Sequence, residues 1–380
     1  MKLSRSAWLK LLLVGTLAVT VAAVPEPVEL SDVYANSSKA VVKSVSEIQH
    51  KLLAAMNSRE STVRFVYQGQ TKSLKAQLKE ALDQAMESDP YIQYTIASYS
   101  YDYRGTSSTA DVTVRLSYRE TAEQTAYVNR KVKEILKVLL KPGMNDHEKV
   151  KVINDWVILN LKYDTSLQKY TAYDGLSSGS TVCQGYSLLT YKLLKEAGIP
   201  NKIVEGTAYA EGNPGGQLHA WNLVLLDGKW YHLDTTWNDP VPNRDGEISY
   251  TYYLLTDAQM EKDHIWIKTY PKANTLYRNT LSTLVSEDSG KTKVYLKLIK
   301  DLEYHLYEKK GIVRTYGDLQ GKVKSASKAG KSELLFRFDG KETDLLVVLQ
   351  DLQRKSGVGS IRYYHSLLDE TDDLKVHISW

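Results

Sequence analysis

Cysteine is almost absent from this chain. Of its 380 residues only Cys183 carries a thiol, so no disulfide can form within the chain. One thiol and scattered histidines give no ligand spacing of the zinc type, and there is no calcium-loop pattern. We therefore expect no metal and no cofactor.

Strong charge of one sign is also lacking. The formal net charge is +4, without a basic block, which argues against nucleic-acid binding. Hydrophobic residues make up 42% and charged residues 25%, a composition typical of globular proteins that are not membrane-integral. Phenylalanine is rare, with 3 residues against 27 tyrosines. Such tyrosines suit partly exposed strand faces or, alternatively, a peptide or glycan groove.

The longest apolar run lies at the beginning of the chain. It extends from Leu11 to Val24, after a basic start, and is short for a spanning helix of ~20 residues. This pattern predicts a signal peptide over residues 1–35, cleaved after Ala23 or Ala35, with an uncleaved N-terminal anchor as the alternative. Either interpretation places the protein outside the cytoplasm, secreted or at the cell surface. A lone thiol in an exported protein is either incidental or kept for chemistry.

The two ends of the chain are related to each other. Residues 61–69 parallel 332–340, and Leu74 parallels Leu345, at an offset of 271 positions. Residues 114–118 parallel 376–380 at an offset of 262, and the difference of nine fits a shorter loop in the second copy. Each copy has the pattern of a strand, an amphipathic helix and two strands, with a helix before them. We therefore predict two small α+β modules, at 36–120 and 286–380.

A different domain, at 121–285, lies between the modules. Its pattern predicts three helices: one over 121–140, a second capped by Asn145 or Asp146, and a third over Tyr186–Ala197. Three strands are predicted after them. Cys183 comes immediately before the third helix. Unpaired N–H groups and the positive end of the helix dipole at this position stabilise a thiolate.

The strands of the middle domain carry two further groups of interest. Asp227-Gly228 predicts a two-residue hairpin in which paired residue numbers sum to 455. In that register Asp234 is a diagonal neighbour of His219 on the same face, within reach of a carboxylate–imidazole hydrogen bond. His232 shares the face and is the alternative base. Cys183, His219 and Asp234 are therefore the predicted catalytic triad of a thiol nucleophile.

These segments resemble a known family, the bacterial branch of the transglutaminase-like superfamily. The resemblance rests on four ordered motifs: Thr181-Val-Cys-Gln-Gly-Tyr186, Leu194-Lys-Glu-Ala-Gly-Ile-Pro200, His219-Ala-Trp-Asn222 and Gly228-Lys-Trp-Tyr-His-Leu-Asp-Thr-Thr-Trp237. It implies a papain-like α+β core with Cys183 as nucleophile, His219 as base and Asp234 as its partner. Candidates for binding substrate or the oxyanion are Gln184, Tyr163 and Trp221.

The sequence thus predicts an α+β protein with a papain-like transglutaminase core between two related modules. We expect a secreted thiol enzyme that acts on amide or peptide bonds through a thioester, most simply a peptidase or amide hydrolase of the cell envelope. The alternatives are a cross-linking transamidase and a non-catalytic envelope binding or scaffold protein. The expected partner is a peptide or protein, such as a cell-wall peptide, with no nucleic acid and no membrane contact except through an uncleaved signal.

Overall fold

The computed structural model describes residues 40–210, 214–239, 248–356 and 359–380. The predicted signal peptide or anchor at 1–35 lies outside these residues. Within them, no helix is long and apolar enough to cross a membrane. The chain divides into two units, Met1–Thr275 and Leu276–Trp380, which are described separately.

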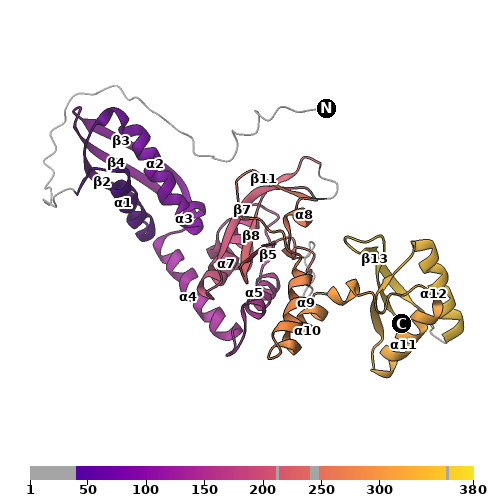
Figure 1. Cartoon of the computed structure of the whole chain (residues 1–380). Coiled ribbons are helices and arrows are strands. Elements are labelled where there is room, and N and C mark those ends of the chain that lie inside the picture. Colours follow the sequence, from indigo (N-terminus) through magenta and orange to yellow (C-terminus); the bar gives the residue numbers. More distant parts are fainter. Residues whose placement is uncertain (1–39, 211–213, 240–247, 357–358) are drawn as a thin grey trace. The chain divides into compact units, whose positions relative to one another are not determined.

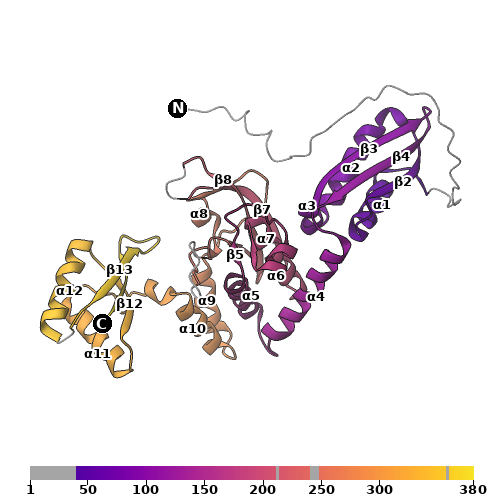
Figure 2. The ribbon, with the colours of Figure 1, turned by 180° about the vertical axis from the view of Figure 1, so that it is seen from behind.

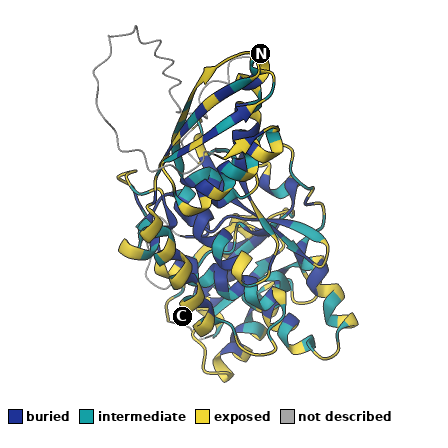
Figure 3. Ribbon diagram, turned by 90° about the vertical axis from the view of Figure 1, so that its left-hand side faces the viewer, coloured by how far each residue is buried: buried dark blue, intermediate teal, exposed yellow. Residues whose placement is uncertain are grey.

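The N-terminal module of the first unit is a four-stranded sheet with helices on one face (Figure 1). The strand order is β1-β2-β4-β3. Buried and exposed residues alternate along β2 and β4, which gives the sheet one core-facing side (Figure 3). The elements are β1 (Val41–Val42), α1 (Val45–Ser58), β2 (Thr62–Gln68), α2 (Leu74–Glu87), α3 (Pro90–Thr95), β3 (Ile96–Gly105) and β4 (Thr109–Tyr118).

The rest of the first unit is the core domain, in which helices precede an antiparallel sheet. The helices are α4 (Ala122–Leu139), α5 (Asp146–Asn160), α6 (Ala172–Ser178) and α7 (Cys183–Glu196). The five-stranded sheet has the order β10-β9-β8-β7-β11. Its strands are β7 (Asn201–Ala208), β8 (Gln217–Leu226), β9 (Lys229–Leu233), β10 (Tyr253–Leu255) and β11 (His264–Trp266). Figure 2 shows α7 beside β7 and β8.

Local sequence explains where the core helices begin. Thr121 and Asn145 cap α4 and α5, and each forms a reciprocal capping box with the third residue of its helix. Asn145, not Asp146, is thus the cap of the second helix. α7 begins at Cys183, three residues before the predicted start at Tyr186. The prediction missed this first turn because its capping residue, Val182, makes no side-chain cap.

The hairpin between β8 and β9 has the predicted register. Leu226 pairs with Lys229 and Leu223 pairs with His232, so paired numbers sum to 455. Asp227 and Gly228 have φ values of 49° and 73°, the left-handed conformations that a type I′ turn requires.

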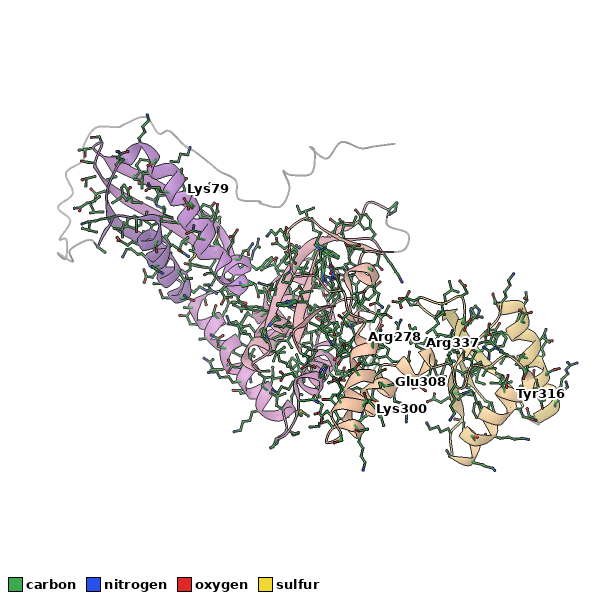
Figure 4. All side chains as sticks on the ribbon, in the orientation of Figure 1. Lys79, Arg278, Lys300, Glu308, Tyr316 and Arg337 are labelled. Carbon is green, nitrogen blue, oxygen red and sulfur yellow. The ribbon has the colours of Figure 1, made fainter. Side chains whose placement is uncertain are left out.

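The second unit begins with helices and ends in the C-terminal module. Its elements are α9 (Tyr277–Glu287), α10 (Thr292–Asp301), the short η2 (Tyr304–Tyr307), α11 (Tyr316–Lys328), β12 (Glu333–Phe338), α12 (Glu342–Ser356), β13 (Arg362–Leu367) and β14 (Leu374–Ser379). Arg278 of α9, labelled in Figure 4, forms an ion pair with Glu370 at 2.5 Å and lies over the ring of Tyr307. This unit therefore includes α9, which the sequence placed with the core.

The two modules are structural repeats. The order β12-β14-β13 matches β2-β4-β3, and the parallel bridge from Val313 to Phe338 matches the pairing of Val42 with Tyr67. The final strand requires a correction, because pairing aligns Val112 with Val376 at an offset of 264 instead of 262. A shift of two residues keeps the same face inward, so the alternating pattern alone could not reveal it. At this strand the difference between the two offsets is therefore seven residues, and it is not loop, because the first copy contains helix α3.

Gly185, in the first turn of α7, allows a close approach between segments. A Cβ at this position would lie 1.9 Å from Thr181 Oγ1 and 2.8 Å from the carbonyl oxygen of Thr171. The absence of a side chain therefore lets the segment before the nucleophile pack against its helix.

We expect Gly185→Ala to destabilise the first unit by roughly 1–3 kcal/mol, because backbone must move to admit the methyl group. The matched control is Gly321→Ala in α11, where no atom lies within 4 Å of the added Cβ. That change should stabilise the second unit by up to ~1 kcal/mol, the helix propensity of alanine over glycine. Calorimetry that resolves the two unfolding transitions measures both shifts, and an unchanged first transition in Gly185→Ala would contradict the close approach.

Candidate active site

The structure brings Cys183, His219 and Asp234 together from three elements. Cys183 is the first residue of α7, His219 lies on β8, and Asp234 directly follows β9. The ring Nε2 of His219 is 2.6 Å from Asp234 Oδ2. Because the aspartate occupies Nε2, the other ring nitrogen is left for the thiol, and Cys183 is close enough to His219 to add to the rise of its pKa.

The histidine and the aspartate are buried, whereas Cys183 is partly exposed. His219 is 5% exposed and Asp234 is 0% exposed. Cys183 is partly exposed and is the free thiol of the chain. The nucleophile candidate is thus more exposed than the two groups that would activate it, which are shielded from water.

Burial and charge act in opposite directions on His219. Burial alone would lower its pKa, but the charge and hydrogen bond of Asp234, together with Cys183, raise the pKa to about 10. Burial would likewise raise the pKa of Asp234, but His219 and then His264 hold that pKa well below its ordinary value. The pair is therefore an imidazolium–carboxylate ion pair at neutral pH, in which the imidazolium can stabilise a neighbouring thiolate.

Backbone donors fix the orientation of the Asp234 carboxylate. Its Oδ1 accepts the N–H groups of Thr236 at 2.9 Å and Trp237 at 3.1 Å. The other oxygen, Oδ2, is thereby directed at His219. This arrangement positions the ring without any need for Asp234 to gain a proton.

A second histidine, His264, lies behind the aspartate. Its Nε2 is 3.4 Å from Asp234 Oδ2, and its Nδ1 is 2.6 Å from Asp263 Oδ1. The Nε2 contact has the distance of an ion pair but not the geometry of a hydrogen bond. Sequence reasoning did not find this residue as part of the site. The only signal was its place in Asp263-His-Ile-Trp266, after the last motif.

His219, Asp234 and His264 form the one metal-compatible cluster among the described residues, with ligand atoms within 4.8 Å of one another. Ligand atoms around a tetrahedral zinc are separated by ~3.3 Å, because each lies ~2.0 Å from the ion. The 2.6 Å between His219 Nε2 and Asp234 Oδ2 is shorter than that and is a hydrogen-bond distance. His219 and Asp234 are therefore a hydrogen-bonded pair that shares a proton, and the three residues do not fit a zinc ion.

The alternative base, His232, has no free nitrogen. Trp221 Nε1 donates to His232 Nδ1 at 2.9 Å, so the ring proton is on Nε2, which lies 2.9 Å from Asp257 Oδ1. Burial lowers the pKa of His232. This histidine is therefore a neutral link between a tryptophan and an aspartate and cannot serve the thiol.

The three candidates for the oxyanion have different fates. Trp221 is 1% exposed and donates its N–H to His232, so it has no donor for substrate; it stacks on the His219 ring at 5.8 Å. Gln184 donates its side-chain amide to the backbone oxygen of Tyr94 at 3.3 Å. Tyr163 lies at the site, since burial first, and then the charge of Cys183, raise its pKa to about 12. Its phenol is therefore protonated at neutral pH.

Backbone amides supply a further set of donors. The N–H groups of Cys183 and Gln184 lie in the first turn of α7, where a helix has no internal acceptor for them. They point along the positive end of the helix dipole, next to the sulfur. A carbonyl oxygen that becomes negative on attack would be stabilised at this position.

Comparison with known proteins agrees with this geometry. Residues 133–235 match the model of the transglutaminase-like superfamily. This segment contains Cys183, His219 and Asp234, so the core domain is transglutaminase-like.

The relatives cover only part of this chain. Kyphoscoliosis peptidase of Homo sapiens is 29% identical over 148 residues, which are 34% of this chain and 22% of the relative. The Lim and transglutaminase domain protein ltd-1 of Caenorhabditis elegans is 24% identical over 190 residues, or 42% and 25% of the two chains. A crystal structure of a TGase has 14% identity and a TM-score of 0.29, and the alignment covers 63% of this chain and 68% of that one. The chain thus spans about a fifth of the length of kyphoscoliosis peptidase, at 22%.

We expect the ion pair of His219 to appear in the pH dependence of stability. Its pKa is about 10 in the folded protein, against ~6.5 in an unfolded chain. A pKa raised on folding gives stability that is fully present below ~6.5 and is lost as the pH rises toward 10. The free energy of unfolding of the first unit should therefore fall over this interval.

Asp234→Asn should remove this component, because the partner that raises the pKa of His219 is gone. Denaturant unfolding at several pH values between ~6.5 and ~10 measures the difference between the variant and the wild type. Other titrating groups are common to both proteins and cancel in that difference. Parallel pH profiles for the two proteins would contradict the ion pair.

Proposed function

We propose that this protein is a thiol enzyme that cleaves amide or peptide bonds through Cys183, His219 and Asp234. The observation that carries the proposal is the buried His219–Asp234 hydrogen bond beside Cys183, the first residue of α7. The similarity to a superfamily that includes a relative named as a peptidase supports it.

The chemistry follows from the charges of the triad. The thiolate of Cys183 attacks the carbonyl carbon, and the oxyanion accepts hydrogen bonds from the first-turn amides of α7. The imidazolium of His219 then donates its proton to the departing amine, the C–N bond breaks, and a thioester remains on the sulfur. His219, now neutral, takes a proton from water, which attacks the thioester; release of the acid restores the thiol and the proton is again shared between Cys183 and His219.

We propose an extracytoplasmic peptide or protein as the substrate, with a cell-wall peptide as one case. The basic start and the apolar run from Leu11 to Val24 support export. Under this proposal the enzyme acts in the cell envelope, and the modules on either side of the core hold it on its substrate.

A transamidase is the second candidate function, because the thioester can pass to an amine in place of water. The same three residues would carry both reactions. Partial exposure of Cys183 supports hydrolysis, since water can reach the thioester.

Alkylation of Cys183 tests the nucleophile directly. At about pH 6 an ordinary thiol, with a pKa of ~8.5, is less than ~1% thiolate, whereas an imidazolium partner increases that fraction. We therefore expect iodoacetamide to modify the folded wild type at least ~10-fold faster than His219→Ala at this pH. Intact-mass spectrometry gives the rates.

Two controls accompany the alkylation. Cys183→Ala should take up no reagent, since the chain has no other cysteine. Guanidine-unfolded wild type supplies the rate of an ordinary cysteine at the same pH. A folded protein that reacts no faster than the unfolded one, with or without His219, would favour the non-catalytic scaffold.

Product analysis separates hydrolysis from transamidation. Incubated with a peptide amide and a labelled primary amine, the wild type should release the free acid and incorporate little of the amine. Asp234→Asn should lower the rate by ~10⁴-fold if the aspartate orients the histidine as in other triads. Stoichiometric incorporation of the amine would overturn the preference for hydrolysis and assign the cross-linking function.

A further inference from the structure

Helix α3 distinguishes the two repeats. The offset between the copies is 271 at Leu74. At Tyr101 it is 262, because the counterpart of Tyr101 is Tyr363: Tyr101 pairs with Val114, and Tyr363 pairs with Ile378. The nine extra residues of the first copy contain α3 (Pro90–Thr95). Asp89 caps this helix by accepting the N–H of Tyr91 at 2.8 Å, and Pro90 begins it. The insertion is therefore an ordered element with its own start signal.

This helix packs against α7, the helix that carries Cys183. Lys195 of α7 forms an ion pair with Asp89 at 2.9 Å, and the Lys192 ammonium lies 4.1 Å from the centre of the Tyr91 ring. Tyr91 donates its hydroxyl to Glu120, at 2.6 Å. Glu120 is 1% exposed, and its other oxygen accepts the N–H of Tyr173 at 3.1 Å. The Tyr91–Glu120 part of the contact is thus buried with its polar groups paired, whereas the Lys195–Asp89 ion pair lies at its exposed edge.

The last turn of α3 lies beside the nucleophile. The backbone oxygen of Tyr94 accepts the side-chain amide of Gln184, the residue after Cys183, at 3.3 Å. The side chain of Tyr94 interacts with Glu205 of β7, the residue before Gly206, and Gly206 pairs with His219. Burial first, and then Glu205, raise the pKa of Tyr94 well above its usual value, and Cys183 is close enough to add to the effect.

Glu205 is held from the other side as well. Its backbone N–H donates to the hydroxyl of Tyr270 at 3.1 Å, and its carboxylate forms an ion pair with Lys268. Tyr94 thus connects three parts of the site: the N-terminal module, the first turn of α7, and the strand that pairs with the histidine strand.

We propose that α3 makes the N-terminal module a part of the thiol site, with Tyr94 as a positioning and specificity residue that forms one wall beside Cys183. Its carbonyl holds the first turn of α7, and its ring and hydroxyl close the Glu205 side of the site. The wall limits the size of the groups that reach the sulfur from this side. The effect of this wall on substrate choice rests on the proposed function, whereas the position of Tyr94 beside the thiol does not. The C-terminal repeat is nine residues shorter at this place, and its described residues, 359–380 after α12, include no counterpart of α3.

Paired alkylation rates test the wall. The probes are iodoacetamide, which is small, and N-phenylmaleimide, which is bulky and also reacts with thiols. In Tyr94→Ala we expect the rate for the bulky reagent, relative to that for the small one, to rise by about 10-fold, because the ring no longer restricts approach. Tyr94→Phe keeps the ring and should retain the wild-type ratio.

Tyr103→Phe, at an exposed position on β3, is the matched control in the same module. A role confined to stability would change both rates alike or lower the melting temperature without changing their ratio. An unchanged ratio in folded Tyr94→Ala therefore overturns the proposal.

The same measurements distinguish this proposal from the proposed function. Rapid iodoacetamide reaction of the wild type, with a changed ratio in Tyr94→Ala, supports both. Rapid reaction with an unchanged ratio overturns the wall alone. An unreactive wild-type thiol that Tyr94→Ala exposes supports the wall and contradicts the thiol enzyme, and a thiol unreactive in both proteins contradicts both.

Discussion

The hydrogen bond between His219 and Asp234 is the interaction on which the site depends. The two side chains are 5% and 0% exposed, so each charge would be costly to bury alone. Paired at 2.6 Å, with backbone donors on the remaining carboxylate oxygen, they keep each other ionised. The charge of the imidazole is thereby available to the sulfur, and the ring cannot rotate away without breaking a buried ion pair. His264, whose Nε2 lies 3.4 Å from the same carboxylate oxygen, adds to this constraint.

The start of α7 supplies the other half of the site. Gly185 lets the first turn approach Thr181 and Thr171, and Val182 leaves the turn without a side-chain cap. The amides of this turn are therefore open on the side of the thiol. Capping by a serine or aspartate would occupy the donors that a developing oxyanion needs.

Duplication explains the flanking modules, and a small insertion explains how they differ. Both have the same strand order and the same bridge to a preceding strand. The first of them contains α3, which contacts α7 and places Tyr94 near the residue that follows the nucleophile. Two copies of one fold can thus have different roles, because a few residues at the edge of a sheet decide what each copy contacts.

The sequence by itself determined the parts of the site that depend on local rules. The turn Asp227-Gly228 sets the register of its hairpin, because a type I′ turn requires both central residues to adopt the left-handed backbone conformation. That register brings Asp234 to His219. Tertiary structure alone decided the direction of Gln184 and the place of His264. The amide of Gln184 bonds to Tyr94, 90 positions away, and no periodicity or turn signal connects residues so distant. Such partners are chosen by packing between separately folded elements, which a local pattern does not encode.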